Sequence, residues 1–349
     1  MTVSKFPALE FHLPKAHRHM AYSLVGDAQS THVLLCLPGL LETRATFDPL
    51  LQAAEGVHGL RVVSVDLCGR GDSSPMPDDK GYTMQVYLED IVQFIRAELM
   101  PEGKPVPHIE VLGTSMGGIL AMYLAHEKSN HIGGLFFNDI GLDLPWMSIY
   151  GLYDGMKTAG RLPTPEEMAE KFNVSVGAVL AVQSPSHFDL PYRKDWKGMK
   201  FGHLLNDFKG PVRLVHGSDS GVCTAQQVKD LQREFPKAAV LEVTGAAHPV
   251  PFNAMVNQFV LQSLNVPARV PSPPALVREA VVPMPRATPT QLVIPLDAPV
   301  ASAKPEPALE ALADPEPVQP QVASAQPEAH TPRVGLLGLI KQLLGATKK

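Results

Sequence analysis

Short apolar runs that end in glycine- or aspartate-rich turns recur along the first two thirds of the chain. Stretches with helical spacing separate them, such as 82–99 and 116–126. Strands that alternate with helices predict an α/β fold with a mostly parallel sheet and crossover helices. The runs expected to form strands are 32–37, 61–66, 108–112, 134–139, 211–216 and 238–243, and a last helix is expected near 252–264.

About seventy residues after the fourth predicted strand do not form another strand–helix unit. A capping box with proline at the first helical position occupies 164–167, and it predicts a helix through about residue 180. Trp146, Tyr150 and Tyr153 precede this helix at near-helical spacing. Ordinary core packing would account for these aromatic residues. Because the insertion follows the carboxyl end of a strand, we expect instead that 143–208 forms a helical cap and that the three line a substrate pocket.

Composition changes sharply after residue 266. From Pro267 onward, 16 of the 34 prolines fall in 83 residues, and no aromatic residue follows Phe259. Such a segment cannot bury enough apolar surface to offset its chain entropy. We therefore expect a globular domain at 1–266 and a disordered, Pro/Ala-rich linker at 267–331.

Beyond this linker lies a short amphipathic segment at 332–347. Its apolar residues share one face of a helix, and a helix this short is marginal by itself in water. It could fold back onto its own domain, or dock on a membrane or lipid surface, or on a protein partner. The residues of this apolar face are Leu336, Leu337, Ile340, Leu343 and Leu344.

Charge and cysteine content limit the partners and the cellular compartment that we expect. The formal net charge is -5, which gives no basic footprint for a nucleic-acid partner. Three cysteines make no disulfide framework and favour a reducing compartment. The N-terminal twenty residues contain no uninterrupted apolar core of a signal peptide, and no apolar run is long enough for a membrane span. We expect a cytoplasmic protein, peripheral to a membrane or lipid surface if the terminal helix docks there.

The segment 113–117 reads Gly-Thr-Ser-Met-Gly and matches the G-x-S-x-G pattern between an apolar strand and a helix. A sharp strand-to-helix turn has no room for Cβ atoms beside the serine, which explains the glycines. The turn exposes the Ser115 hydroxyl and directs the helix N-terminus at a developing oxyanion. Ser115 is therefore the predicted nucleophile.

A serine hydroxyl needs a base to accept its proton. His248 follows the last predicted strand, in a loop that can reach the carboxyl edge of the sheet, and we expect it to be this base. Asp219, in the loop after 211–216, gives the chain order Ser–Asp–His and is the expected acid. Asp139, at the carboxyl end of the fourth predicted strand, is the alternative.

The oxyanion should be held by backbone N–H groups. Gly39 lets the turn after the first predicted strand present the Leu40 N–H, and the Met116 N–H would be the second donor. The glycine-rich turn at 66–74 lacks the lysine spacing of a phosphate-binding loop and is expected to be structural.

No metal or cofactor is expected. His12, His17 and His19 have a spacing that metal sites can use. They have no cysteine or acidic partner in register, so we expect them to be solvated.

These motifs resemble the α/β-hydrolase superfamily, and in particular its generic bacterial hydrolases, over about residues 17–264. The resemblance implies an eight-stranded, mostly parallel sheet, a helical cap and a serine hydrolase reaction without a cofactor. It depends on the segments at 66–73, 81–83, 113–118, 138–141 and 188–191.

Two departures from the family pattern concern the site. Pro38 and Gly39 stand where relatives carry His-Gly, and Gly221 stands at the position of the family's usual acid. Asp219 lies two residues before that position, so a different loop path would have to bring it to the site.

The residues together predict a serine hydrolase that cleaves a carboxylic ester or a related acyl substrate. Two alternatives remain open. The same fold also supports acyltransferases and carbon–carbon bond hydrolases. A displaced acid could instead have disabled catalysis and left a binding or scaffolding protein.

Overall fold

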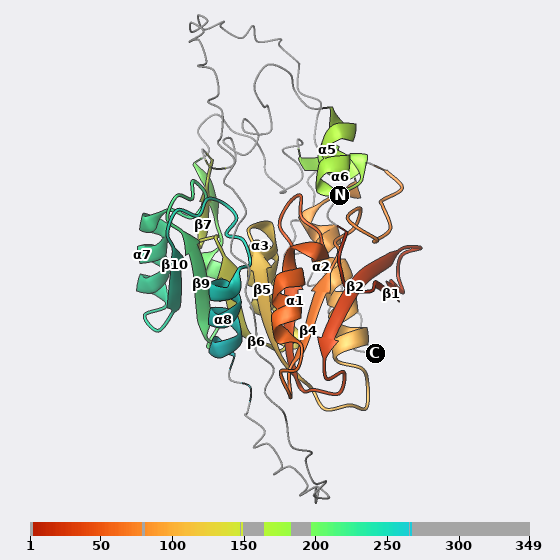
Figure 1. The fold of residues 1–349 in the computed structure, drawn as a ribbon, viewed down its shortest axis with the longest axis horizontal. Coiled ribbons are helices and arrows are strands. Elements are labelled where there is room, and N and C mark those ends of the chain that lie inside the picture. The colour runs from red at the N-terminus through yellow and green to blue at the C-terminus, as the bar shows by residue number, and fades with distance from the viewer. Residues whose placement is uncertain are drawn as a thin grey trace, which may run out of the picture. The chain divides into compact units, whose positions relative to one another are not determined.

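A computed structural model describes residues 3–78, 81–146, 148, 164–182, 197–264 and 266 (Figure 1). Its centre is an eight-stranded sheet in the order β1-β2-β4-β3-β5-β6-β9-β10. All pairs from β4 to β10 are parallel, whereas β2 is antiparallel to both β1 and β4. The strands are β1 (Leu9–His12), β2 (His19–Gly26), β3 (His32–Leu37), β4 (Arg61–Val65), β5 (His108–Thr114), β6 (Ile132–Asn138), β9 (Val212–Gly217) and β10 (Ala239–Val243).

The six strands predicted from the apolar runs are β3, β4, β5, β6, β9 and β10, each within two residues at either end. The predicted mostly parallel eight-stranded α/β sheet is confirmed. The hairpin of β1 and β2 was not predicted, because polar residues interrupt it. In this hairpin His12 pairs with His19, whose ring nitrogens contact the Asp72 carbonyl and the Ser74 hydroxyl.

Helices cover both faces of the sheet (Figure 1). Helices α1 and α8 pack together over one face, and they share a core with alternate strand residues such as Leu34 and Cys36. Because side chains alternate along a strand, Val33 and Leu35 are buried on the opposite face, where α2 and α3 pack. The helices that accompany the sheet are α1 (Asp48–Ala54), α2 (Met84–Phe94), α3 (Met116–His126), α7 (Ala225–Glu234) and α8 (Ala254–Ser263). Short helical turns lie at Arg44–Phe47, Ile95–Leu99, Lys128–Asn130 and Gly202–Leu205.

The described part of the cap region differs from the expected single long helix. The capping box at Thr164 is present, but the helix ends at Phe172 and a second one begins at Val176. Asn173 stands between them with φ 52°, a left-handed conformation that terminates a helix. The elements of this region are α5 (Pro165–Phe172), α6 (Val176–Val182) and a two-stranded antiparallel ribbon of β7 (Asp143–Pro145) and β8 (Gly198–Lys200).

Hydrogen bonds join the α5–α6 junction to the glycine-rich turn at 66–74. The Gly71 N–H donates to the Asn173 carbonyl, at 2.9 Å, and the Ser175 N–H donates to the Gly69 carbonyl, at 2.6 Å. The Tyr82 and Ser175 hydroxyl oxygens lie 2.9 Å apart. This part of the cap is therefore fixed to a turn at the carboxyl edge of the sheet.

Several predictions from sequence lie outside the described residues. They are the linker at 267–331, the amphipathic helix at 332–347, Tyr150 and Tyr153, and the remainder of the predicted cap. Among the helices that the structure describes, none combines the length and apolarity required to cross a bilayer.

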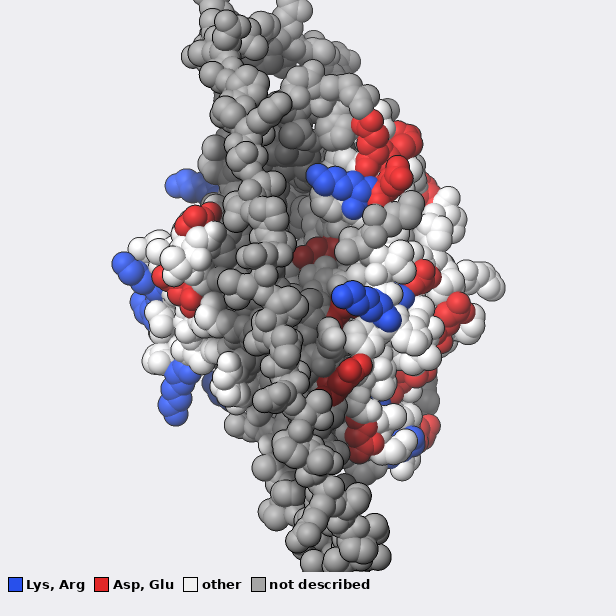
Figure 2. All heavy atoms as spheres, viewed as in Figure 1, with Lys and Arg blue, Asp and Glu red and all other residues white. Residues whose placement is uncertain are grey.

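Charged side chains of both signs are interspersed on the visible described surface, as Figure 2 shows. Acidic side chains gather over α5, which carries Glu166, Glu167 and Glu170. On this view the described basic side chains form no continuous patch. This distribution agrees with the acidic net charge.

A buried ion pair crosses the sheet beneath β6. Arg213 on β9 donates to the Glu110 carboxylate on β5, and both side chains are at most 5 % exposed. Gly134, which lies between them on β6, leaves the space that a Cβ atom would fill. The guanidinium also lies over the Phe136 ring, 4.4 Å from its centre. Removing one partner of such a pair leaves the other charge buried and uncompensated.

We therefore expect Arg213→Met to lower the free energy of unfolding by about 3–5 kcal/mol. Urea denaturation followed by circular dichroism measures this loss. Arg233→Met is the matched control, because Arg233 is exposed and pairs with Asp230 on the surface at 2.7 Å. An exposed pair contributes about 0–1 kcal/mol. Equal losses in the two variants would contradict a structural role for the buried pair.

Candidate active site

Ser115 occupies the sharp turn between β5 and α3. Its φ of 50° and ψ of -114° lie outside the common regions, and the residue is the N-cap of α3. A Cβ atom on Gly113 would lie 2.3 Å from the Gly117 backbone, and one on Gly117 would lie 2.1 Å from the Leu37 carbonyl oxygen. Both glycines are therefore sterically required, and the crowding accounts for the G-x-S-x-G sequence. The turn leaves the Ser115 side chain half-buried at the edge of the sheet.

His248 lies between Ser115 and an aspartate. Its Nε2 is 2.9 Å from the Ser115 Oγ, and its Nδ1 is 2.8 Å from the Asp139 Oδ2. The residue comes from the loop between β10 and α8, and its side chain is 10 % exposed. The structure thus forms a serine–imidazole–carboxylate chain from three distant segments.

Asp139 directly follows β6 and has φ 59°, a left-handed conformation that aspartate tolerates better than most residues. Its N–H donates to the Val215 carbonyl at 2.8 Å, and its Oδ1 accepts the Gly217 N–H at 3.0 Å. The side chain is fully buried. A backbone N–H and the imidazole thus give each of the two carboxylate oxygens a hydrogen-bond partner.

Asp219, the first choice from sequence, lies elsewhere. It is exposed, its Oδ1 accepts a hydrogen bond from the Ser218 hydroxyl at 2.8 Å, and its N–H donates to the Ala246 carbonyl. These bonds hold the loop after β9 in a tight turn, so the different path needed to bring Asp219 to the imidazole is not taken. The structure places the alternative residue, Asp139, against His248.

The loop after β3 lies directly on the Ser115 turn. Met116 begins α3, so its N–H has no acceptor within the helix. The Leu40 carbonyl accepts two hydrogen bonds from Arg70, at 3.1 Å from Nε and 2.8 Å from Nη2. The Gly39 N–H donates to the Glu42 Oε2 at 2.7 Å. These contacts fix the peptides on either side of the Leu40 N–H, which is the predicted oxyanion donor.

Arg70 was not identified from sequence as a site residue. Its side chain is fully buried, and it also donates to the Cys68 carbonyl and lies over the Tyr87 ring at 4.8 Å. The turn at 66–74 was predicted to be structural, and it positions Arg70 to donate hydrogen bonds to the Leu40 carbonyl. Nothing in the local sequence distinguishes such an arginine from one in solvent.

Glu42 was likewise not identified. Burial raises the pKa of this carboxyl to about 7, and the Gly39 N–H and the charge of His248 act in the opposite direction. Its proximity to His248 adds a titratable group to the site. A single glutamate in a polar loop gives no signal of this kind in the sequence.

Of the three residues predicted to line a substrate pocket, only Trp146 is among the described residues. It follows β7 and is half-buried, and its N–H donates to the Lys197 carbonyl at 3.2 Å. Tyr150 and Tyr153 lie outside the described part of the chain.

Comparisons with known proteins concern the fold and the family. The family model for the alpha/beta hydrolase fold matches residues 32–156, which include β3, the Ser115 turn and Asp139. The 3-hydroxybutyrate-oligomer hydrolase of Cupriavidus necator is 28% identical over 275 residues, which cover 68% of this chain and 90% of the relative. The sn-1-specific diacylglycerol lipase ABHD11 of Mus musculus is 25% identical over 66% of this chain and 79% of its own.

Among solved structures, an alpha/beta hydrolase from Novosphingobium aromaticivorans has a TM-score of 0.56. It is 18% identical, and the match covers 74% of this chain and 98% of the other. At this identity the likeness concerns the fold. The family model, the sequence relatives and the sheet topology agree on one architecture, and the chain has the α/β-hydrolase fold.

Proposed function

We propose that the chain is a serine hydrolase that cleaves carboxylic esters, with Ser115 as nucleophile, His248 as base and Asp139 as acid. The observation that carries this proposal is the hydrogen-bonded chain of the three side chains, with separations of 2.9 Å and 2.8 Å. Such a chain supplies the base that a serine hydroxyl needs and orients that base.

The arrangement supports a covalent mechanism. His248 takes the Ser115 proton through Nε2 as the oxygen attacks the substrate carbonyl, and Asp139 stabilises the imidazolium through Nδ1. The Leu40 and Met116 N–H groups would hold the oxyanion, each contributing about 3 kcal/mol. His248 then protonates the departing alkoxide, and water, activated by the same imidazole, releases the acid from Ser115.

The two sequence relatives indicate where to look for the substrate. One is named for hydrolysis of 3-hydroxybutyrate oligomers and the other for a diacylglycerol lipase activity. Both names describe ester cleavage, which supports an ester rather than a carbon–carbon bond or an acyl acceptor other than water. We propose oligoesters of short hydroxy acids and acylglycerols as the first classes to compare, beside p-nitrophenyl esters of graded chain length.

The alternative of a binding or scaffolding protein rested on the missing family acid at Gly221. Asp139 fills that role in the proposal, from the end of another strand. Docking of 332–347 on a membrane or lipid surface, or on a protein, stays a prediction from sequence.

Loss of the nucleophile tests the proposal directly. We expect Ser115→Ala to fold, to lose labelling by a fluorophosphonate probe, and to lose several orders of magnitude in esterase kcat. Ser129→Ala, in an exposed turn, is the control and should be labelled like the wild type. Activity of Ser115→Ala within tenfold of wild type would rule out this nucleophile.

The two aspartates give a second test. Asp139→Asn should lower kcat by about 10⁴-fold, because an amide cannot stabilise the imidazolium or hold its productive tautomer. Asp219→Asn, on the surface, should stay within a few-fold of wild type. Ester turnover measured under saturating substrate decides between them. The reverse order would return the acid to the loop after β9.

Glu42 predicts a dependence of stability on pH. Its pKa is raised from 4.5 to about 7 in the folded protein, so its contribution is fully present below about pH 4.5 and is lost as the pH rises through about 7. Glu42→Gln does not ionise. Its free energy of unfolding, relative to wild type, should therefore rise by about 1–3 kcal/mol between pH 5 and pH 8.

Urea midpoints of both proteins at each pH measure this difference. Glu102→Gln, at an exposed position, is the control and should show no such trend. A difference between Glu42→Gln and wild type that stays constant with pH would show that Glu42 does not ionise in this range.

A further inference from the structure

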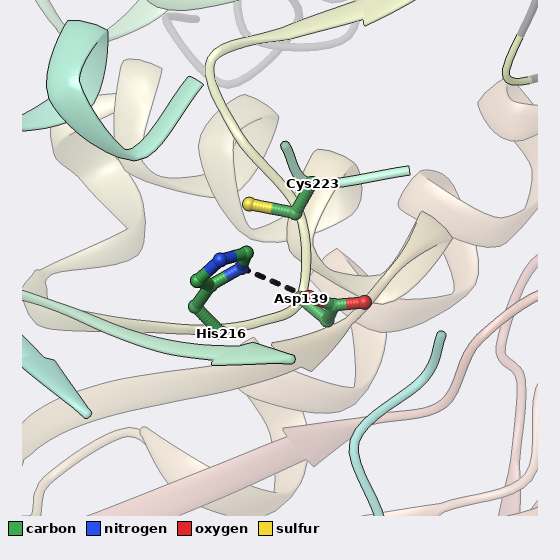
Figure 3. A group of neighbouring side chains, drawn as sticks. All are labelled: Asp139, His216 and Cys223. Atoms are coloured by element: carbon green, nitrogen blue, oxygen red, sulfur yellow. Dashed lines mark ion pairs between the residues drawn. The ribbon is translucent and has the colours of Figure 1, made fainter. Parts of the chain in front are cut away.

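Three buried side chains that could ligate a metal ion converge behind the active site (Figure 3). They are Asp139 after β6, His216 on β9 and Cys223 in the loop between β9 and α7. One ligand atom from each lies within 4.8 Å of the other two. Among the described residues, this is the one set of three or more such side chains that meets this condition.

His216 provides an independent observation. Its side chain is 3 % exposed, and its Nδ1 has no hydrogen-bond partner among the described residues. The Asp139 Oδ1 is 3.6 Å away, close enough for an ion pair with a protonated imidazole but too far for a hydrogen bond. Buried ring nitrogens are normally paired, so an unpaired one that faces a carboxylate and a thiol requires an explanation. A bound cation would provide the missing partner.

The electrostatic environment favours a cation at this position. Burial raises the pKa of the Cys223 thiol, and the charges of Asp139 and Asp143 raise it further. The same negative charges that disfavour a thiolate attract a divalent cation. Once bound, the positive charge of the cation favours the thiolate over the thiol. The Asp139 Oδ1 already accepts the Gly217 N–H, but a carboxylate oxygen has a second lone pair for a metal.

The donor set selects the metal. One thiolate sulfur, one imidazole nitrogen and one carboxylate oxygen form a typical ligand set for Zn²⁺. Zinc binds such ligands at about 2.0–2.3 Å, and tetrahedral coordination at these lengths separates neighbouring donor atoms by about 3.5 Å. No two of the three ligand atoms here are more than 4.8 Å apart, so side-chain adjustments of about 1 Å can bring them to that spacing.

We propose that Asp139, His216 and Cys223 form an inhibitory zinc site. The inhibitory part rests on the proposed function, because the ion would bind the carboxylate that orients His248. Coordination at Oδ1 draws electron density from the carboxylate and places positive charge beside the imidazole. Both effects oppose the imidazolium that forms when Ser115 attacks. On binding, the Cys223 thiol releases its proton to solvent and its sulfur forms a bond to zinc.

The loop at 218–223 provides a route for the ion. Ser218, Asp219 and Gly221 are exposed, and a Cβ atom on Gly221 would meet nothing within 4 Å. Cys223 is buried at the end of this loop, so we expect the ion to enter when the loop opens. The loop also contacts the cap region, since the Ser148 hydroxyl donates to the Gly221 carbonyl at 3.0 Å.

Direct metal binding is the first arm of the test. The full-length, tag-free protein is freed of metal and titrated with Co²⁺, whose bond to a thiolate produces a charge-transfer absorption band. Zn²⁺ affinity is then obtained by competition. We expect the wild type to bind one metal ion per chain. Cys223→Ala should lose the charge-transfer band, and its Zn²⁺ affinity should be more than about tenfold weaker than that of the wild type.

Cys36→Ala is the matched control. Cys36 is also fully buried, and burial alone raises the pKa of its thiol, without a contribution from a described carboxylate. This variant should bind Co²⁺ and Zn²⁺ like the wild type. Cys223→Ser serves as a second variant if Cys223→Ala does not fold, and circular dichroism checks the folding of each protein.

Activity is the second arm, measured with and without Zn²⁺ and compared with each variant's own metal-free rate. Zinc should inhibit the wild type and Cys36→Ala, and should inhibit Cys223→Ala only at more than about tenfold higher concentration. Absence of the cobalt band in the wild type overturns the site. Equal zinc inhibition of Cys223→Ala assigns the effect to other ligands and overturns the proposal.

The two proposals can fail separately. If Ser115 is not labelled by the fluorophosphonate probe, the proposed hydrolase function and the proposed inhibition are both overturned. The cobalt spectrum still tests the metal site in that case. With labelling and ester turnover present, a cobalt band without zinc inhibition overturns the inhibitory role alone.

Discussion

The site depends on the two hydrogen bonds of the Asp139 carboxylate. This carboxylate is fully buried, and its two oxygens face different segments: Oδ1 accepts the Gly217 N–H, and Oδ2 faces His248. A buried charge is tolerated only where such donors compensate its lost hydration. The carboxylate therefore links the ends of β6 and β9 to the loop after β10, and it fixes the imidazole at Ser115.

Surrounding hydrogen bonds maintain this arrangement against a strained backbone. Ser115 and Asp139 both have positive φ values, and both stand at the ends of neighbouring parallel strands. The Ser115 N–H donates to the Asn138 carbonyl at 3.0 Å, and the Asn138 side chain donates to the Val250 carbonyl at 2.9 Å, two residues after His248. Unfavourable backbone conformations persist where surrounding contacts determine them in this way.

Residues remote in sequence support the opposite side of the site. Arg70 holds the Leu40 carbonyl, and the turn that carries Arg70 also pairs with the α5–α6 junction. The loop after β9 similarly contacts the cap region through Ser148. Both the loop at Leu40 and the proposed zinc site are thus connected to described residues of the segment 143–208.

The sequence alone determined the six parallel strands and the strand-to-helix turn at Ser115, because both depend on local patterns. Apolar runs identified β3, β4, β5, β6, β9 and β10, and the glycines around Ser115 reflect a steric requirement within five residues. His248 could be proposed because chain order places it after the last strand.

Other features were decided by tertiary structure, because they depend on contacts between distant segments. The helix predicted through residue 180 ends at Phe172, where Asn173 turns left-handed and its carbonyl accepts the Gly71 N–H. Chain order allowed either Asp219 or Asp139 to reach the imidazole, and only the packing of β6 beside β9 put Asp139 there. The order of the strands in the sheet likewise decides the positions of Arg70, Glu42, His216 and Cys223. No local sequence pattern indicates that order.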